Sequence, residues 1–401
     1  MLNAAPAFGV LAGLLGATLH FAGALKSTPA VAALPFDITL LSGLTVLGLL
    51  PLLVVGRHWR LSAGLGLPLA GCGFLWLWWV LAAVWSPWGD GVSERLRDIV
   101  LIGPVMLLAG LLIGAEPTAR RVFGLAVIVL GVFVAASVAW GLAMDAVVLG
   151  GRVGADPSRV RVQYQVAGLS IACAAALVAL RATAASGAAR WFWLGLLAAL
   201  GAGVLLPGGR GAFIGLALTV ALAPALRLVL EGRVGPALGW MGLVALAGLG
   251  GLGALVMLPG QAENLATLER LMRPDGGTAS AREILWGEAW RLGGWAGLGP
   301  GGFPPAVGVG QDRGLHPHNH AIEALVEGGA VGLLLWLASF GGAAAFVLAR
   351  MGRVAPERAA MIVALTLPIA LTAMVSTDLG NRMVWFALGL ALSLGMEARR
   401  V

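Results

Sequence analysis

Charged residues are scarce in this sequence, and their scarcity excludes a soluble globule. Of the 401 residues, 59% are hydrophobic and only 11% are charged, whereas a soluble domain carries about 25% charged residues. The 61 glycines follow no three-residue period, which excludes collagen. The apolar runs are continuous and do not alternate over about 10 residues, which excludes a membrane β-barrel. The composition therefore predicts an all-α polytopic membrane protein.

Lysine, tyrosine and cysteine are also rare. Lys26 is the only lysine, so 25 of the 26 basic residues are arginine, and Tyr164 is the only tyrosine. Cys72 and Cys173 lie inside apolar runs. We expect both cysteines to be small packing residues and not parts of a disulfide or a metal site.

Apolar stretches long enough to cross a bilayer recur along the chain and predict about twelve transmembrane helices. They cover residues 4–25, 31–55, 63–85, 98–114, 122–149, 164–180, 191–207, 211–230, 237–258, 327–349, 359–375 and 383–396. Three regions follow: nine helices within 1–258, one long polar loop over 259–326, and three helices within 327–401.

The arginines predict how the chain is oriented. With the N-terminus in the cytoplasm, 13 of the 26 bases fall on inner connections and eight, Arg95 and Arg97 among them, on short outer ones. This bias places both termini in the cytoplasm and the long loop outside. The inner charge is then +9 and the outer charge −2, so the net +7 is a topology signal. We expect a lipid bilayer around the chain and no nucleic-acid partner.

The long loop carries the motifs that predict chemistry, since a loop of this length is commonly functional. Ser280 and Glu283 have the spacing of a capping box. A helix beginning there would gather three side chains on one apolar face, those of Leu285, Ala289 and Leu292. Arg282 and Trp286, four residues apart, would share a neighbouring face.

A glycine-rich segment follows this helix. Gly297, Gly299 and Gly302 match the G-x-G-x-x-G pattern, but no strand precedes them. The dinucleotide-binding interpretation requires a βαβ unit. We therefore expect a tight turn that docks the loop onto the membrane surface.

Three of the five histidines lie within five residues, at His316, His318 and His320. They could form part of a metal site, but no third ligand at standard spacing is obvious. They could also be solvated loop residues. The interpretation we favour is a general base, because an imidazole with a pKa of about 6.5 suits proton abstraction from a hydroxyl. We expect no metal and no cofactor.

Arginines on the outer connections are the second candidate group. Arg210 follows Pro207-Gly208-Gly209 at a short turn, and Arg152, Arg159 and Arg161 precede Tyr164. Each arginine could be an interfacial anchor or pair with an acid such as Asp145. Together with Arg282 they favour a phosphate-bearing ligand, because guanidinium groups bind phosphate oxygens bidentately.

These residues resemble the O-antigen ligase and polymerase family of bacterial envelopes over about 150–335. Three motifs of the long loop carry the resemblance: Arg282 with Trp286, then Gly297-x-Gly299, then His318-Asn319 followed by Glu327-Gly328-Gly329. Two more precede it: Arg210-Gly211-Ala212 and Val162-Gln163-Tyr164. One position departs from the family, where Gly209 replaces the usual Ser or Thr before the arginine.

The resemblance implies an integral-membrane glycosyltransferase of the bacterial inner membrane, with a periplasmic, metal-independent site. Its donor would be a glycan on undecaprenyl diphosphate, and transfer would invert the anomeric carbon. His318 would be the general base, and Arg210 and Arg282 would hold the diphosphate. The residues expected to bind substrate are Arg152, Arg161, Tyr164, His316, Asn319 and Trp286.

Three functions remain open at this point. An O-antigen ligase would use lipid A-core as the acceptor, and the Gln163-Tyr164 stretch and the moderate loop length favour it. A polymerase would use a second lipid-linked repeat unit. A transporter of the lipid-linked glycan would need ionisable groups near the bilayer midplane, where the sequence predicts almost no charge.

Overall fold

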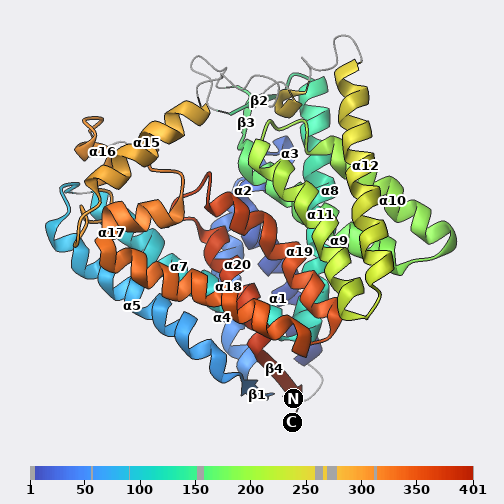
Figure 1. Ribbon diagram of the computed structural model, residues 1–401, viewed down its shortest axis with the longest axis horizontal. Helices are drawn as coiled ribbons and strands as arrows, with labels where there is room; N and C mark the ends of the chain where they lie inside the picture. Colours follow the sequence, from blue (N-terminus) through green and yellow to red (C-terminus); the bar gives the residue numbers. More distant parts are fainter. Residues whose placement is uncertain are drawn as a thin grey trace. The chain divides into compact units, whose positions relative to one another are not determined.

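A computed structural model describes residues 5–55, 57–89, 91–150, 158–257, 265–268, 278–310 and 314–400. Nearly all of its elements are helices (Figure 1). The chain divides into two compact units. Unit 1 comprises Met1–Gly56, Glu116–Pro274 and Met351–Ile369, and unit 2 comprises Arg57–Ala115, Asp275–Arg350 and Ala370–Val401.

Unit 1 is organised around one buried helix. Its helices are α1 (Ala5–His20), α2 (Ala22–Leu25), α3 (Pro29–Ala32), α4 (Ile38–Val54), α8 (Pro117–Ala143), α9 (Tyr164–Ala184), α10 (Gly187–Gly203), α11 (Arg210–Leu230), α12 (Val234–Met257) and most of α19 (Pro356–Ala373). A short strand β2 (Val147–Leu149) pairs in parallel with β3 (Val160–Val162). Helix α9 contacts α8, α10 and α11, and its many alanines let these neighbours approach closely.

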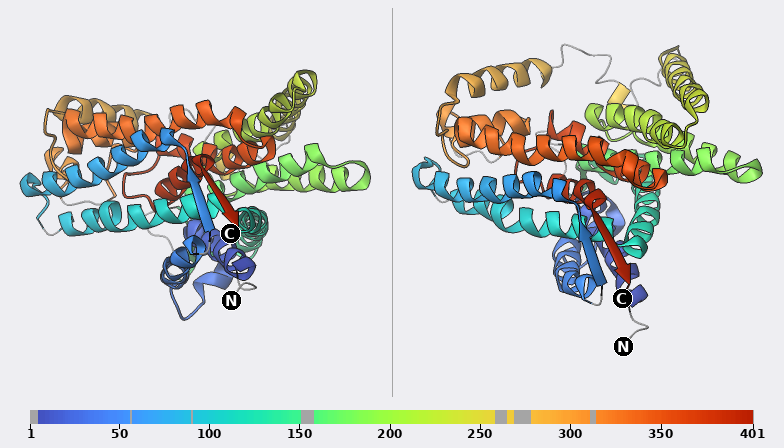
Figure 2. Two further views of the ribbon diagram at one scale, coloured as in Figure 1. Left: turned by 90° about the horizontal axis from the view of Figure 1, so that it is seen from below. Right: turned by 60° about the horizontal axis from the view of Figure 1, so that its bottom comes forward.

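Unit 2 carries the long loop from residue 275 onward and the helices packed against it. Its helices are α5 (Gly66–Ala82), α6 (Gly91–Leu96), α7 (Gly103–Ala115), α15 (Thr278–Leu292), α16 (Phe303–Ala306), α17 (His320–Trp336), α18 (Gly342–Arg350) and α20 (Arg382–Leu392). Two π-helical stretches, Arg97–Ile102 and Leu337–Gly341, join α6 to α7 and α17 to α18. Strand β1 (Arg57–Leu61) pairs antiparallel with β4 (Met396–Arg400), as Figure 2 shows.

Glycine allows the closest helix contact in unit 2, between α7 and α20. A Cβ added to Gly110 would lie 3.0 Å from the Leu390 nitrogen, and one added to Gly389 would lie 2.7 Å from the Leu111 nitrogen. The two backbones therefore touch, as they do where small residues line the interface of membrane helices.

The two cysteines are small residues inside the packed helices, since Cys72 and Cys173 are both buried and form no disulfide. Their predicted role as packing residues is confirmed.

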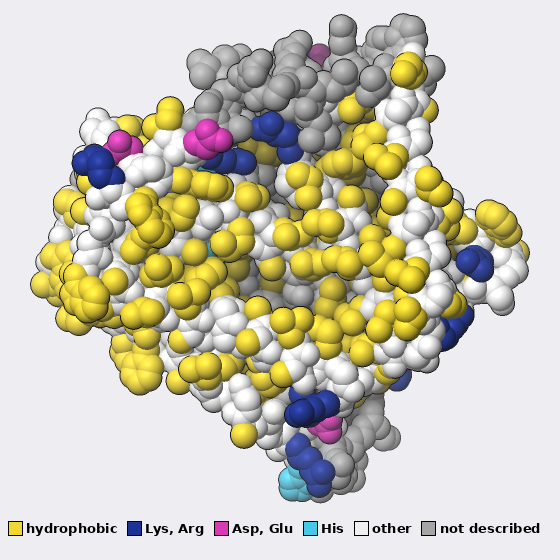
Figure 3. Space-filling view, viewed as in Figure 1, with side chains coloured by type: hydrophobic (Ala, Val, Ile, Leu, Met, Phe, Trp, Pro, Cys, Tyr) yellow, Lys and Arg dark blue, Asp and Glu magenta, His cyan; other side chains and the backbone are white. Residues whose placement is uncertain are grey.

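The helices are apolar enough to span a membrane. Among the described residues, eight helical stretches have the length and composition to cross a bilayer, and three shorter apolar helices accompany them. Large hydrophobic side chains such as Leu44, Leu77 and Leu246 are exposed, and hydrophobic groups dominate the face in Figure 3. Each of the twelve predicted segments overlaps a helix, and the number of membrane spans stays a prediction. The chain is an all-α polytopic membrane protein.

Two candidate spans begin seven residues earlier than predicted. One covers Gly91–Ala115 and the other His320–Arg353, where the sequence predicted starts at 98 and 327. Arg95 was expected on an outer connection, but it lies within the first of these helices and is only 3% exposed. The interpretation of Arg95 as a connecting residue is wrong. Acidic partners in the fold neutralise its charge, and pairing of this kind permits burial.

Candidate active site

Helix α15 presents Arg282 and Trp286 to the histidine loop. The predicted apolar face is confirmed: Ala289 is buried with Phe303 and Val326, and Leu285 and Leu292 pack against them. The predicted start of the helix differs: α15 begins at Thr278, two residues before the expected cap at Ser280. On the neighbouring face, the Trp286 indole donates to the Pro317 carbonyl at 2.6 Å. The Arg282 guanidinium donates to the Ser376 hydroxyl at 3.4 Å.

The glycine-rich segment docks onto α17 and onto the chain after α5. Gly297 and Gly299 have positive φ angles of 73° and 82°, which glycine adopts without strain. The Gly299 nitrogen donates to the Glu327 carbonyl at 2.9 Å, and the Trp85 indole donates to the Gly297 carbonyl at 3.2 Å. The predicted tight turn is confirmed, while the surface it contacts is protein. The loop is thus fixed to the helix that follows the histidines.

His316 and His318 lie side by side. Their ring centroids lie 4.0 Å apart, and the His318 backbone nitrogen donates to Nδ1 of His316 at 3.1 Å. Pro317 separates them, and His318 has a left-handed φ of 57°, an uncommon conformation for a residue with a side chain. Strained backbone of this kind clusters at functional sites.

The surroundings of the two rings favour the neutral imidazole. Burial, followed by the positive charge of Arg282, lowers the pKa of His318 below its usual 6.5, while the Ser376 backbone and Asp378 oppose the shift. Burial lowers the pKa of His316 to about 3, against the opposing effect of Asp378. A neutral imidazole can accept a proton near neutral pH. The Nδ1 atom of His318 has no hydrogen-bond partner among the described residues.

Asn319 and His320 begin α17 and bind the segment after α19. The Asn319 side chain accepts from the Ala321 and Ile322 nitrogens, as an N-cap residue does, and its amide donates to the Met374 carbonyl at 2.9 Å. His320 is fully buried, and its Nε2 lies 3.1 Å from the Thr377 hydroxyl. Asn319 therefore stabilises the start of the helix directly after the histidine loop.

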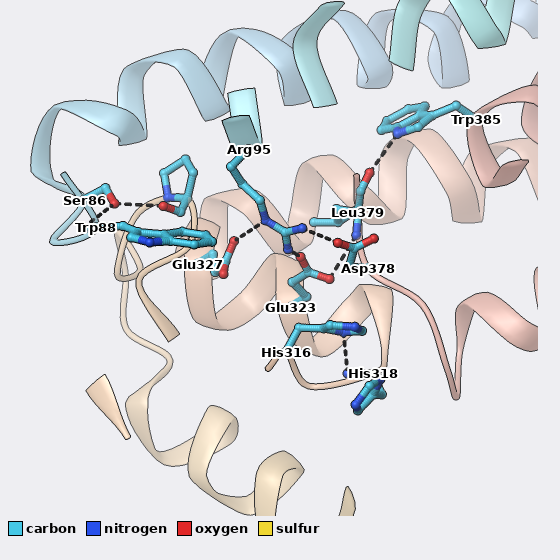
Figure 4. A network of polar contacts seen from close by, with 11 residues as sticks. Ser86, Trp88, Arg95, His316, His318, Glu323, Glu327, Asp378, Leu379 and Trp385 are labelled. Atoms are coloured by element: carbon cyan, nitrogen blue, oxygen red, sulfur yellow. Dashed lines mark hydrogen bonds and ion pairs between the residues drawn. The ribbon is translucent and has the colours of Figure 1, made fainter. Parts of the chain in front are cut away.

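A buried charge cluster lies next to the histidines, and sequence analysis did not detect it (Figure 4). The Arg95 guanidinium contacts the carboxylates of Glu323 and Asp378, and its Nε lies 3.9 Å from Glu327. Although burial alone would raise the pKa of Asp378, the charge of Arg95 lowers it to about 2. The only signal in the sequence was the i, i+4 spacing of Glu323 and Glu327 on one helix face.

The other predicted site residues belong to unit 1. Arg210 is the first residue of α11, after Gly208, whose φ is 92° and whose nitrogen donates to the Thr267 hydroxyl at 3.0 Å. Arg161 donates to the Gly150 carbonyl at 3.0 Å. Tyr164 begins α9. Arg152 lies outside the described residues.

Arg159 has the structural role that the sequence left open. Arg159 forms an ion pair with Asp145 at 2.5 Å, which joins the two ends of the connection between α8 and α9. This pairing accounts for Arg159 without a ligand.

The unit 2 residues can abstract a proton beside a fixed cation. His318 supplies the acceptor and Arg282 supplies the positive charge, and both contact Ser376. Within the described ranges, no three side chains of His, Cys, Asp or Glu are grouped so that they could hold a metal ion. The arrangement suits a reaction in which a hydroxyl loses its proton while negative charge develops on a leaving group.

The comparison with protein families agrees with this chemistry. Residues 194–337 match the family model described as O-antigen ligase, a region that contains Arg210, Arg282 and His318. The match covers just over a third of the 401 residues, and no curated protein matches the chain. It supports O-antigen ligase or polymerase activity in general, with lipid-linked glycans as substrates. The chain is a multi-pass membrane protein, and its residues 194–337 are similar to the O-antigen ligase family.

Proposed function

We propose that the protein is an O-antigen ligase of the bacterial inner membrane. It transfers a glycan from undecaprenyl diphosphate to a sugar hydroxyl of lipid A-core on the periplasmic face, with both termini in the cytoplasm. The observation that carries the proposal is the convergence of His318 and Arg282 on Ser376. This pair lies in the region that matches the O-antigen ligase family. The apolar helices of the same chain would keep the donor's lipid tail beside the site.

In the proposed reaction, His318 accepts the proton of the acceptor hydroxyl. The hydroxyl oxygen forms a bond with the anomeric carbon of the donor sugar as the bond from that carbon to the diphosphate oxygen breaks. Attack from the face opposite the leaving group inverts the anomeric carbon. The displaced undecaprenyl diphosphate carries the negative charge away from the sugar, and the proton remains on the imidazole until solvent removes it.

Two arginines bind the diphosphate in this proposal. Arg282 is placed on the folded helix α15 and contacts Ser376 beside the base. Arg210 is assigned to the same task on the resemblance of its Arg-Gly-Ala turn to that of the family. A guanidinium retains its charge in a low-dielectric site and binds two phosphate oxygens at once. Cations directed at developing leaving-group charge can replace a metal ion.

The remaining residues have supporting roles in the proposal. Trp286 and Asn319 hold the histidine loop from its two sides, and His316 stabilises the His318 backbone. Arg152, Arg161 and Tyr164 contribute to glycan binding, an assignment that rests on the residue types and the resemblance.

One experiment tests the function directly. Purified protein in detergent or nanodiscs is supplied with an undecaprenyl-diphosphate glycan and with either lipid A-core or a second lipid-linked repeat unit. We expect lipid A-core to be extended. Extension of the lipid-linked unit alone would instead identify a polymerase. Movement of the donor across a vesicle membrane without any transfer would identify a transporter, and both outcomes would contradict the proposal.

A further inference from the structure

The buried charge cluster connects the same two segments that hold the proposed base. Glu323 and Glu327 lie on α17, which begins two residues after His318, and Asp378 lies two residues after Ser376. The Arg95 guanidinium from α6 contacts carboxylates on both segments. Figure 4 shows the guanidinium directed between Glu323 and Asp378. Arg95 is therefore a cross-link between the segment that follows the histidine loop and the segment against which it packs.

Further polar contacts join these two segments. The ring of His318 bonds the Ser376 backbone, His320 contacts the Thr377 hydroxyl, and the Leu379 nitrogen donates to Glu323 at 3.0 Å. Residues 374–379 thus provide a series of polar groups to residues 318–323. The position of the His318 ring depends on whether residues 374–379 stay in place.

The charges make Arg95 essential to this arrangement. Three carboxylates face one guanidinium, and the Arg95 and Glu323 side chains are only 4% and 0% exposed. Arg95 is the group that joins Glu323 to Asp378. Removing one partner of a buried ion pair is strongly destabilising, so without Arg95 the contact between the two segments would be weakened. A lysine retains the charge but lacks the planar fork that can contact several carboxylates.

We propose that Arg95 is a positioning residue for glycan transfer, which holds residues 374–379 against α17 and thereby fixes the ring of His318. This inference rests on the proposed function of His318 as the base. Arg95 is buried and contacts carboxylates, so it acts through these carboxylates and does not touch the substrate. Its replacement should therefore change turnover and the environment of His318 while donor binding persists.

The test compares two substitutions on neighbouring helical residues. Arg95→Lys removes the planar fork, and Arg97→Lys is the matched control, since the Arg97 side chain is 53% exposed and pairs with the adjacent Asp98. We expect Arg95→Lys to lower kcat about 100-fold, the scale of a misplaced catalytic group. The KM for the lipid-linked donor should stay within about twofold of its original value. Arg97→Lys should retain the original kcat and KM.

A second readout does not depend on activity. Histidine side chains labelled with ¹⁵N are titrated by NMR in the folded protein, and His318→Ala assigns the His318 signal. Arg282, Asp378 and His316 face this ring, and they are unchanged in the Arg95→Lys protein. If residues 374–379 loosen, the ring becomes more hydrated and its pKa should rise toward 6.5. The Arg97→Lys protein should titrate as the original does.

Several outcomes overturn the inference. A folded Arg95→Lys protein with unchanged kcat and unchanged His318 titration would show that Arg95 does not position the base. A raised KM with unchanged kcat would make Arg95 a binding residue. If Arg95→Lys does not fold, Glu323→Gln is used, because it weakens the Arg95 and Leu379 contacts while retaining the side-chain shape. An unshifted His318 titration in that protein would also overturn it. Absence of transfer by the original protein would contradict the proposed function alone, because the titration still tests the Arg95 contact.

Discussion

The backbone nitrogen of His318 donates to Nδ1 of His316 at 3.1 Å, and the two rings lie 4.0 Å apart. This contact assigns different roles to the two histidines. His316 uses Nδ1 as an acceptor for the backbone and so stabilises the left-handed conformation of His318. The Nδ1 atom of His318, by contrast, has no hydrogen-bond partner among the described residues.

Replacement of His318 by alanine should abolish transfer. We expect kcat to fall by about 10² to 10⁴, the usual contribution of a general base, while binding of the lipid-linked donor persists. Transfer to lipid A-core and donor binding are measured in parallel. His58→Ala is the matched control, because His58 is an exposed residue of β1 and takes no part in the proposed site. An H318A protein with near-normal turnover would contradict the assignment of the base.

The pH dependence of transfer should depend on two charged neighbours of His318 in opposite directions. A base works only when unprotonated, and the pKa of His318 lies below 6.5. Activity should therefore persist at neutral pH and be lost as the pH falls through that lowered pKa. Arg282 lowers this pKa and Asp378 raises it. Arg282→Gln should move the acidic limb to higher pH, and Asp378→Asn should move it to lower pH.

The measurement is the profile of kcat/KM against pH for the original protein and the two variants. It remains informative at reduced activity, because the position of the limb is read from relative rates. If both substitutions move the limb in the same direction, the electrostatic account of the His318 pKa is wrong.

Local patterns predicted those parts of the site that depend on neighbours in the chain. The apolar face of α15 followed from helical spacing, and its burial against Phe303 agrees. The concentration of three histidines within five residues marked the loop that contains His316 and His318. Spacing also predicted that Arg282 and Trp286 share a face, and both contact the histidine loop or the segment beside it.

The sequence could not predict contacts between distant segments. Arg95 binds Glu323 and Asp378, which are 228 and 283 residues away in the sequence. Helical periodicity predicts only contacts between residues close in the sequence. Charge counting placed Arg95 on a connection because an isolated arginine is costly inside a membrane. Its acidic partners remove most of that cost. A buried ion cluster of this kind can be identified only once the packing of the helices is known.

A lysine in place of Arg282, which is proposed to bind the diphosphate, should impair transfer. Arg282→Lys retains the positive charge but loses the fork that binds two phosphate oxygens. Loss of one charge-assisted hydrogen bond costs about 1.5–3 kcal/mol, which corresponds to a rate about ten- to a hundredfold lower. Arg210→Lys should have a similar effect. Transfer is measured at saturating and limiting donor concentrations.

Arg291→Lys provides the control on the same helix as Arg282. Its side chain is 66% exposed and pairs with Glu288 at 2.6 Å. This substitution should leave transfer unchanged. Activity that is unchanged in both Arg282→Lys and Arg210→Lys would exclude the proposed diphosphate clamp. A loss restored by added Zn²⁺ after chelation would instead point to a metal site.

The stability of α17, the helix after the histidines, should depend on glycine at position 329. Gly329 has φ 69° and ψ −168° within α17, a region open almost only to glycine, where other residues cost about 1–3 kcal/mol. A Cβ there would also lie 2.6 Å from the Ala296 carbonyl carbon, because the glycine-rich turn is docked against it. Gly329→Ala should therefore lower the free energy of unfolding by at least this amount.

Gly287→Ala is the matched control, since Gly287 lies inside α15 with open space around it. Alanine at this position should stabilise the helix by about 0.5–1 kcal/mol. Thermal unfolding in detergent measures both, and an unfolding midpoint for Gly329→Ala at or above that of the original protein would show that the turn does not require glycine.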